Sequence, residues 1–322
     1  TKGKIVFNAI KEEDSFVLKL ILLDDSIPKE LINDKLKAVL NRLIFNRLFS
    51  NAFLLPAERT GLNLFYKELS SKRTAVFHHK IIKSDIHTPE LIKDFIVSRY
   101  SQPIADYIDF LNNSFELKKF NSDFKDLAIE IQQKILNGQY IVETDGIYFI
   151  PYNIRSQTDN FNQKISLHLS SSTVKTFFSL VFYLEHLAKK GETLIIDEPE
   201  LNLHPENQRK IAIILVMIAN RGIKVIVSTH SDYFIREINN LIMLKAEFQS
   251  KTEIMQNYGY SENMLISDQN VKAYLFDDNG IKLMEMDSKE GIIANTFDNV
   301  INNLNNVSDD IYYQKEADLE NA

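Results

Sequence analysis

Two short apolar segments, with a helical pattern between them, restrict the possible folds more than any other feature of the sequence. Residues 193–197 read TLIID and residues 223–228 read IKVIVS, and the spacing of apolar residues predicts a helix over residues 206–220. A short and nearly continuous apolar run is typical of a parallel strand that is covered on both faces. Strands that alternate with helices in this way indicate an α/β fold with a parallel sheet.

Further elements are predicted on both sides of this β-α-β unit. A helical pattern extends from about Thr88 to Leu136, and we expect Gly138 to end it as a C-cap. After about residue 246 the pattern predicts short strands and a polar helix near residues 296–305. The other predicted elements are strands at 4–10, 16–23 and 52–56, helices at 28–48, 57–71 and 174–189, and a hairpin at 139–151 that turns at Asp145-Gly146.

The composition excludes several classes of protein and site. The 322 residues contain no cysteine, which excludes disulfides, zinc–thiolate sites and cysteine nucleophiles and fits a reducing cytoplasm. The sequence has no apolar stretch of about 18 residues, so no membrane-spanning helix is expected. The net charge of −7 argues against a protein that coats nucleic acid non-specifically, because such proteins usually carry an excess of Lys and Arg.

The first apolar segment ends in two carboxylates, Asp197 and Glu198. Ligands of open α/β folds bind at the edge where the carboxyl ends of the strands lie. At that edge Asp197 suits Mg²⁺, which keeps part of its water shell, and Glu198 suits the activation of a water that attacks a γ-phosphate. A strand followed by an acidic turn has the same pattern without any ligand.

The second apolar segment continues as VIVSTH at residues 225–230 and ends in His230. Since parallel strands end at a common edge, His230 is expected close to the two carboxylates, where it can hydrogen-bond a terminal phosphate or the attacking water. A lone histidine at a strand end is also common as a structural residue. Upstream, residues 169–173 read LSSST before a predicted helix, and hydroxyls at a helix start serve either as an anion site or as N-caps.

The order of these three motifs resembles the ABC-type branch of the AAA-family ATPases, and most closely the compact members that include the RecF, SMC and overcoming-lysogenization-defect ATPases. In this resemblance LSSST at 169–173 corresponds to the signature motif, TLIIDE at 193–198 to Walker B, LNLHP at 201–205 to the D-loop, and His230 to the switch histidine. The segment LLPAERTGL at 54–62 is also similar to these ATPases. The resemblance covers roughly residues 50–245.

The resemblance implies a head-to-tail dimer, or a higher homo-oligomer, that closes on Mg-ATP and opens after hydrolysis. Asp197 would hold the metal, and Glu198 and His230 would be catalytic. The serines Ser170, Ser171 and Ser172 would cap the nucleotide of the partner, with Ser170 as the signature serine, and His204 of the D-loop would contact the partner. The resemblance also implies the role of an ATPase or sensor in bacterial antiphage defence or DNA repair, in the cytoplasm, with a separate nuclease or toxin chain as a possible effector.

Two departures from the family pattern stand out. The usual signature carries glycines where Ser171 and Ser172 stand here. No segment matches the P-loop pattern G-x-x-x-x-G-K-[S/T], whose backbone cradles the phosphates. We expect the natural chain to supply this loop upstream of Thr1. The alternative is an ATPase-like scaffold that binds no nucleotide and holds an effector protein.

With the resemblance, the chain divides into four predicted segments. The α/β fold is expected to be an ABC-type nucleotide-binding domain with a helical insertion and a small C-terminal α+β appendage. The segments are the remainder of an N-terminal ATPase lobe (1–83), the helical insertion (84–138), the ATPase core (139–245) and the appendage (246–322).

Two secondary candidates remain open at this point. Glu58 and Arg59 of the PAERTG segment either serve the ATPase or cap a helix. A locally basic run either contacts DNA phosphates, as in an ATP-gated DNA clamp, or forms a solvated face. The residues of this run are Lys72, Arg73, His78, His79, Lys80 and Lys83.

Overall fold

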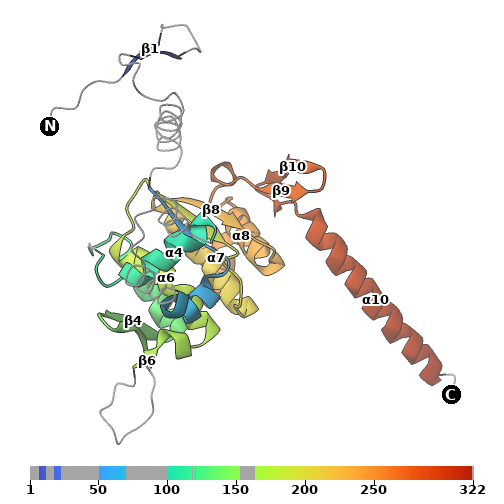
Figure 1. Cartoon of the computed structure of the whole chain (residues 1–322). Helices are drawn as coiled ribbons and strands as arrows, with labels where there is room; N and C mark the ends of the chain where they lie inside the picture. Colours follow the sequence, from blue (N-terminus) through green and yellow to red (C-terminus); the bar gives the residue numbers. More distant parts are fainter. Residues whose placement is uncertain are drawn as a thin grey trace, which may run out of the picture. The chain divides into compact units, whose positions relative to one another are not determined.

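The computed structural model describes residues 7–11, 18–22, 51–69, 100–117, 119, 121–152 and 164–320 (Figure 1). The chain separates into two compact units, residues 1–51 and residues 52–322. In the first unit, β1 (Phe7–Lys11) pairs antiparallel with β2 (Leu18–Leu22), which confirms the predicted pair of strands. The helix predicted at 28–48 and the basic run from Lys72 to Lys83 lie outside the described residues.

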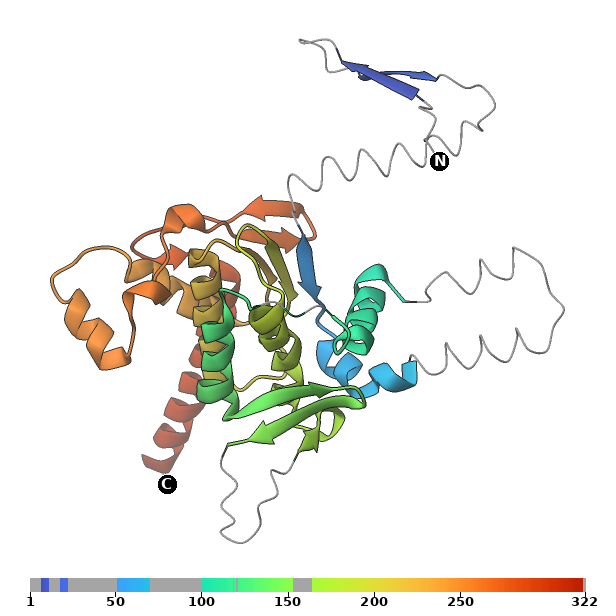
Figure 2. The same ribbon diagram turned by 90° about the vertical axis from the view of Figure 1, so that its left-hand side faces the viewer.

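The second unit is built on a parallel sheet of three strands in the order β3-β7-β8 (Figure 2). These strands are β3 (Ala52–Leu55), β7 (Thr193–Asp197) and β8 (Lys224–Ser228). The predicted strands at 52–56, 193–197 and 223–228 are therefore confirmed, together with the α/β class. The register pairs Asp197 with Ser228, so both strands end at the same level.

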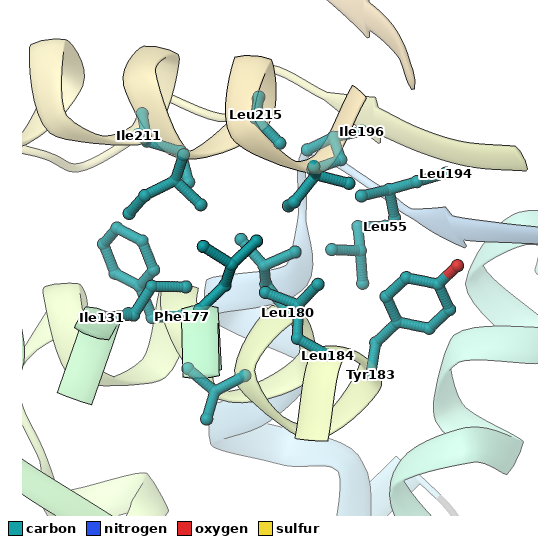
Figure 3. Packing of buried hydrophobic residues seen from close by; sticks show 14 of the residues in the cluster. Leu55, Ile131, Phe177, Leu180, Tyr183, Leu184, Leu194, Ile196, Ile211 and Leu215 are labelled. Carbon is teal, nitrogen blue, oxygen red and sulfur yellow. The ribbon is translucent and has the colours of Figure 1, made fainter. Parts of the chain in front are cut away.

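Helices α6 (Ser172–His186) and α7 (Pro205–Asn220) cover one face of this sheet. Figure 3 shows Phe177 and Leu180 of α6 gathered with Ile196 of β7 and Ile211 of α7 in one buried cluster. Because the apolar positions of these helices recur at helical spacing, the sequence pattern already points the same faces inward. This layer fixes where the carboxyl end of β7 lies.

The opposite face of the sheet is not covered within the described part of the chain, contrary to the expectation of strands buried on both faces. The side chain of Ile226 on β8 is 43% exposed, and those of Leu54 and Ile195 are only half-buried. Burial alternates along β8, because Val225 and Val227 face the helices while their neighbours face away. Among the described residues, no strand pairs with the outer edge of β8.

Part of the predicted helical insertion is integral to the core. Helices α4 (Gln102–Asn113) and α5 (Lys125–Ile131) bury one face each, and α5 continues into the π-helical turn η1 (Gln132–Leu136). The Tyr107 hydroxyl of α4 bonds the Ser179 hydroxyl of α6 and donates to the side-chain oxygen of Asn63, 3.3 Å away. Asn63 belongs to a helix over residues 59–69. These contacts join the segment to both neighbouring helices.

The end of this helical segment differs from the prediction. Asn137, with φ of 49°, takes the left-handed position of the C-cap, and Gly138 is already the first residue of β4 (Gly138–Glu143). A Cβ at Gly138 would lie 2.3 Å from the Phe149 ring, so this glycine is required by packing rather than by helix capping. The predicted hairpin is confirmed, since β4 pairs antiparallel with β5 (Gly146–Pro151) across a turn at residues 144–145.

The remaining elements complete the second unit. The predicted tail strands and helix are present, and the helix is longer than predicted. These elements are β6 (Ile165–Ser166), η2 (Leu167–Leu169), α8 (Asp232–Met243), α9 (Lys251–Tyr258), η3 (Glu262–Met264), η4 (Asp268–Asn270), β9 (Tyr274–Asp277), β10 (Gly280–Leu283), β11 (Met286–Asp287), β12 (Gly291–Ile292) and α10 (Asn295–Glu320). In the part of the chain that the structure describes, no helix has the length and apolar character needed to cross a bilayer.

Candidate functional site

The ends of β7 and β8 bring three of the predicted site residues together. The Ser228 hydroxyl donates to a carboxylate oxygen of Asp197, and the backbone N–H of Glu198 donates to the carbonyl oxygen of Ser228 at 3.1 Å. The imidazole Nε2 of His230 lies 3.9 Å from a carboxylate oxygen of Glu198. We refer to Asp197, Glu198, Ser228 and His230 as the carboxylate edge. Two carboxylates, a hydroxyl and an imidazole open to solvent form a site suited to metal binding and proton transfer.

The backbone at Glu198 is held in a strained conformation. Its φ is +44°, in the left-handed region that residues other than glycine rarely adopt. Such a conformation costs about 1–3 kcal/mol and persists only where surrounding contacts enforce it. Strain of this kind concentrates at functional sites, and here it sets the direction in which the Glu198 carboxylate leaves the strand.

The contacts that enforce this conformation come from Arg59. Arg59 is 2% exposed, and its guanidinium donates to the backbone oxygens of Asp197 and Glu198, each at 2.7 Å, and to that of Pro56 at 3.1 Å. Burial lowers the pKa of Arg59, while Tyr107 and the nearby carboxylates, Glu200 among them, act in the opposite direction. The planar fork of a guanidinium suits this bridging of two carbonyls. Arg59 therefore fixes the backbone that carries both carboxylates.

A second buried group, Glu200, fixes the segment that follows β8. One of its carboxylate oxygens accepts hydrogen bonds from the Thr229 hydroxyl and the backbone N–H of His230, both at 2.8 Å. The other oxygen, Oε2, is buried without a hydrogen-bond partner in the described chain. The loop after β7 thereby holds the backbone of His230, so the two strand ends cannot shift independently.

The hydroxyl-rich segment before α6 differs from the carboxylate edge in how its side chains are bonded and exposed. Ser171 is the N-cap of α6, and its hydroxyl accepts from the backbone N–H of Val174 at 3.3 Å. Ser170 is buried, and its hydroxyl donates to the carbonyl of Ser166 at 3.2 Å. Ser171 and Ser172 are exposed, and Leu169 beside them is 73% exposed. We refer to residues 169–172 as the serine start. Within the described residues no hydrogen bond or ion pair joins it to the carboxylate edge.

A shared neighbour, Thr60, lies between the two regions. Its hydroxyl bonds the Thr176 hydroxyl of α6 at 2.9 Å and accepts from the side-chain amide of Asn202 at 3.4 Å. Asn202 belongs to the loop after β7 and also has a positive φ, 62°. In the same loop His204 is the N-cap of α7, where its Nδ1 accepts from the backbone N–H of Glu206 at 3.3 Å.

Comparison with protein families identifies the domain. A family model described as "AAA domain, putative AbiEii toxin, Type IV TA system" matches residues 14–236, which is more than half of the chain. The chain belongs to this AAA family. No curated protein matches the chain. The AAA domain contains both strand ends of the carboxylate edge and the serine start, so these residues lie inside an ATPase-type domain.

The donor groups at the carboxylate edge of the AAA domain fit a magnesium ion. No group of three or more His, Asp or Glu residues is placed to hold a metal among the residues described. Magnesium does not require such a cage, because it keeps several waters and binds one or two carboxylates together with substrate phosphates. Asp197 with the neighbouring Ser228 hydroxyl provides an oxygen set of this kind.

Two supporting residues of the AAA domain were not predicted from the sequence, and a third was left undecided. Ser228 and Glu200 were assigned no role, and Arg59 stayed open between a cap and a functional residue. The position of Ser228 beside Asp197 could have been predicted from the sequence, because both strands end in polar residues and parallel pairing aligns those ends. The contacts of Arg59 span 138 and 139 residues along the chain, and local sequence patterns carry no signal for contacts at that range.

Proposed function

We propose that this AAA domain binds Mg-ATP at the carboxylate edge and hydrolyses it. In this proposal Asp197 holds the metal through water, Glu198 accepts the proton of the attacking water, and His230 contacts the γ-phosphate or that water. The observation that carries the proposal is the meeting of Glu198 and His230, 3.9 Å apart, with Glu198 held in a strained backbone conformation. A paired carboxylate and imidazole at the C-terminal edge of a parallel sheet suit phosphoryl transfer.

In the proposed hydrolysis, the metal and the residues of the carboxylate edge have different tasks. Magnesium would neutralise charge on the phosphates. The Glu198 carboxylate needs a fixed direction to align a water for in-line attack, and the three hydrogen bonds of Arg59 supply that rigidity. The hydrogen bond between Glu200 and the backbone of His230 holds the imidazole at the same edge. A site built in this way does not have to reorganise when the substrate binds.

The proposal requires a loop that cradles the β- and γ-phosphates. In the part of the chain that the structure describes, no strand pairs with the outer edge of β8 and no helix covers the sheet face at Ile226, so another parallel strand and a helix fit there. A strand added there would end at the carboxylate edge, and a helix following it would cover Leu54, Ile195 and Ile226. Strand, loop and helix in that order form the P-loop unit. We propose that a segment with a P-loop occupies this place.

The serine start supports a role in a homodimer or higher homo-oligomer. Exposed Ser171 and Ser172 stand at the first turn of α6, where free N–H groups and the helix dipole favour an anion. The exposed Leu169 beside them gives this surface an apolar part, as interfaces require. We propose that the serine start of one chain caps the γ-phosphate bound to its partner, and that His204 lies at the same interface.

The family description includes the words "putative AbiEii toxin, Type IV TA system", which suit an ATPase that controls an effector. We propose that the protein is the ATPase or sensor component of a bacterial antiphage defence or DNA-repair system, with a nuclease or toxin as a separate chain. In this role ATP binding closes the oligomer, and the closed state differs from the open state in its affinity for the effector.

The test is steady-state ATP hydrolysis by the natural-length protein, including any residues that precede Thr1, beside its Glu198→Gln variant. Loss of a general base is expected to lower turnover by about 10²–10⁴-fold. Glu206→Gln is the matched control, because Glu206 is an exposed acid at the start of α7 whose one ion pair among the described residues is with Lys210. Equal turnover in Glu198→Gln and the control would contradict the proposed base. Absence of both turnover and ATP binding in the parent would favour a scaffold that holds an effector.

A further inference from the structure

The C-terminal helix α10 has an apolar face that the described part of the chain leaves exposed. It runs without interruption from Asn295 to Glu320 (Figure 1), and the side chains of residues 302–319 are all exposed. Among these exposed residues are Leu304, Val307 and Ile311, with Val300 one turn earlier. Large apolar side chains in such a row are usually buried by a partner.

The first turn of α10 is fixed to α8. Arg236 of α8 forms an ion pair with Asp298 at 3.1 Å. Just before the helix, the side-chain amide of Asn239 donates to the carbonyl of Ile292 at 3.0 Å and its oxygen accepts from the Ile292 N–H at 2.8 Å. The helix therefore begins at a defined place on the second unit, next to the helix that follows His230.

The composition of α10 argues that it needs packing to be stable. Six asparagines, at 295, 299, 302, 303, 305 and 306, lie in its first half, and asparagine has low helix propensity. Helical stability in proteins comes mainly from burial of an apolar face, and helices without packing are marginal in water. Side-chain interactions within α10 add little to the stability of the helix; an example is the hydrogen bond of 2.6 Å from the Tyr312 hydroxyl to the Glu316 carboxylate.

The spacing of the apolar face identifies the kind of partner. Phe297, Val300, Leu304, Val307 and Ile311 follow one another at intervals of three, four, three and four residues. This is the a/d pattern of a coiled coil, which repeats every 3.5 residues on average. Such a seam fits the same seam on another helix, so the surface is complementary to itself.

Charges beside the seam select the orientation. With Leu304 and Ile311 at position a, Asp310 occupies position g and Lys315 the following position e. In a parallel pair in register, a g residue faces the next e residue of the partner, so Asp310 of each chain would meet Lys315 of the other. An antiparallel pair places equivalent positions opposite each other and loses this complementarity. We infer that α10 forms a parallel coiled coil with α10 of a second copy of this chain.

This association is separate from the ATP-dependent contact at the serine start, because it uses different residues and needs no nucleotide. It would keep copies together while the ATPase interfaces open and close. Its failure would leave the proposed ATPase function untouched, and the converse also holds.

Disulfide trapping tests the inference, since the chain contains no cysteine of its own. Val300→Cys and Ile311→Cys each place one thiol on the seam, and Asp309→Cys places one on the outward position f. The full chain, without nucleotide and under mild oxidation, should cross-link to itself at both seam positions, with only background cross-linking for Asp309→Cys. Both seam positions can react with themselves only in a parallel pair in register.

Mass by light scattering provides the second measurement. Leu304→Asp should lower the nucleotide-free mass to that of a single chain, whereas the exposed substitution Asp309→Asn should leave it unchanged. Cross-linking of the seam cysteines no greater than that of the control, or a parent mass of one chain, would overturn the inference. Cross-linking at only one seam position would overturn the parallel orientation.

Discussion

The carboxylate edge and the serine start both place polar residues at the end of a secondary-structure element, yet they are built in different ways. At the carboxylate edge, buried side chains from distant parts of the chain hold the backbone through hydrogen bonds. Arg59 donates to backbone oxygens at the end of β7, and Glu200 accepts from a backbone N–H after β8. At the serine start, the one hydrogen bond of the Ser171 hydroxyl among the described residues is to its own helix, and Leu169 and Ser172 are exposed. The difference indicates that one region is organised within the chain, whereas the other is available to a second molecule.

The largest expected effect comes from loosening the carboxylate edge with Arg59→Lys. An ammonium group cannot bridge two carbonyls as a guanidinium does, so a backbone oxygen of Asp197 or Glu198 loses its donor. Displacement of a catalytic group by about 1 Å costs on the order of 10²-fold in rate. We therefore expect kcat to fall by this order while KM for ATP changes little.

The matched control for this substitution is Arg221→Lys, which alters an arginine paired with Asp126 away from both regions. Thermal unfolding of both variants separates a positioning effect from general destabilisation. A buried carbonyl left without a donor costs about 1–3 kcal/mol. If Arg59→Lys lowered the melting temperature and left kcat unchanged, Arg59 would be a purely structural residue.

The next effect tests whether the serine start is an interface. Ser172→Arg keeps the Ser171 cap and adds a long cation to an exposed position, whereas Ser170→Arg would force a charge into a buried one. The arginine side chain is much longer than that of serine and does not fit a close contact with the partner, and a forced misfit of this kind costs about 1–3 kcal/mol, so ATP-dependent association should weaken by about 10–10²-fold. Light scattering with and without ATP measures this in the Leu304→Asp background, where α10 no longer holds two copies together. Ser250→Arg, at the exposed N-cap of α9, is the control, and equal ATP-dependent masses in the two variants would contradict an interface.

A smaller effect is expected at the link between the two regions. Thr60→Val removes the hydroxyl that contacts both Thr176 and Asn202, and a lost hydrogen bond costs about 0.5–1.5 kcal/mol. Because Thr60 and Thr176 share one bond, the double variant with Thr176→Val should be scarcely less stable than either single variant in urea unfolding. Strictly additive losses would show that the pair is not coupled.

The smallest effect concerns a pair outside both regions. The hydrogen bonds from Arg221 lower the pKa of Asp126, and two of its N–H groups reach the carboxylate at 2.5 Å. A depressed folded-state pKa contributes stability above the unfolded pKa, and this contribution is lost as pH falls through the folded value. The carboxylate is largely exposed, so Asp126→Asn should cost at most about 1 kcal/mol at neutral pH and nothing in strong acid. Unfolding at several pH values measures the difference, and turnover should not change.

Local patterns predicted most elements of the fold. The strands at β7 and β8, the helices α6 and α7 and the hairpin after residue 138 all follow from periodicity and turn residues, which depend on neighbours in sequence. The expected helical cap at Gly138 was wrong, because the glycine is required by the Phe149 ring across the hairpin. Of the two sheet faces that were expected to be buried, the described residues cover one, because burial depends on which elements pack above a strand and not on the strand itself.

The candidate site shows the same division. Asp197, Glu198 and His230 were predicted to lie together, because parallel strands end at one edge. Their partners Arg59 and Glu200 depend on long-range packing, and the left-handed backbone at Glu198 has no residue signature such as glycine. The catalytic roles of these residues, the nucleotide-capping roles of Ser170, Ser171 and Ser172, and the interface role of His204 stay predictions.

The nucleotide retained by the Glu198→Gln protein tests the central claim most directly. The natural-length variant would be incubated with Mg-ATP, separated from free nucleotide and denatured, and the released nucleotide would be identified by chromatography. The account predicts that Glu198→Gln retains unhydrolysed ATP, because binding survives without the base, while the parent releases ADP. Release of ADP by the variant at the rate of the parent, or retention of no nucleotide by either protein, would contradict it.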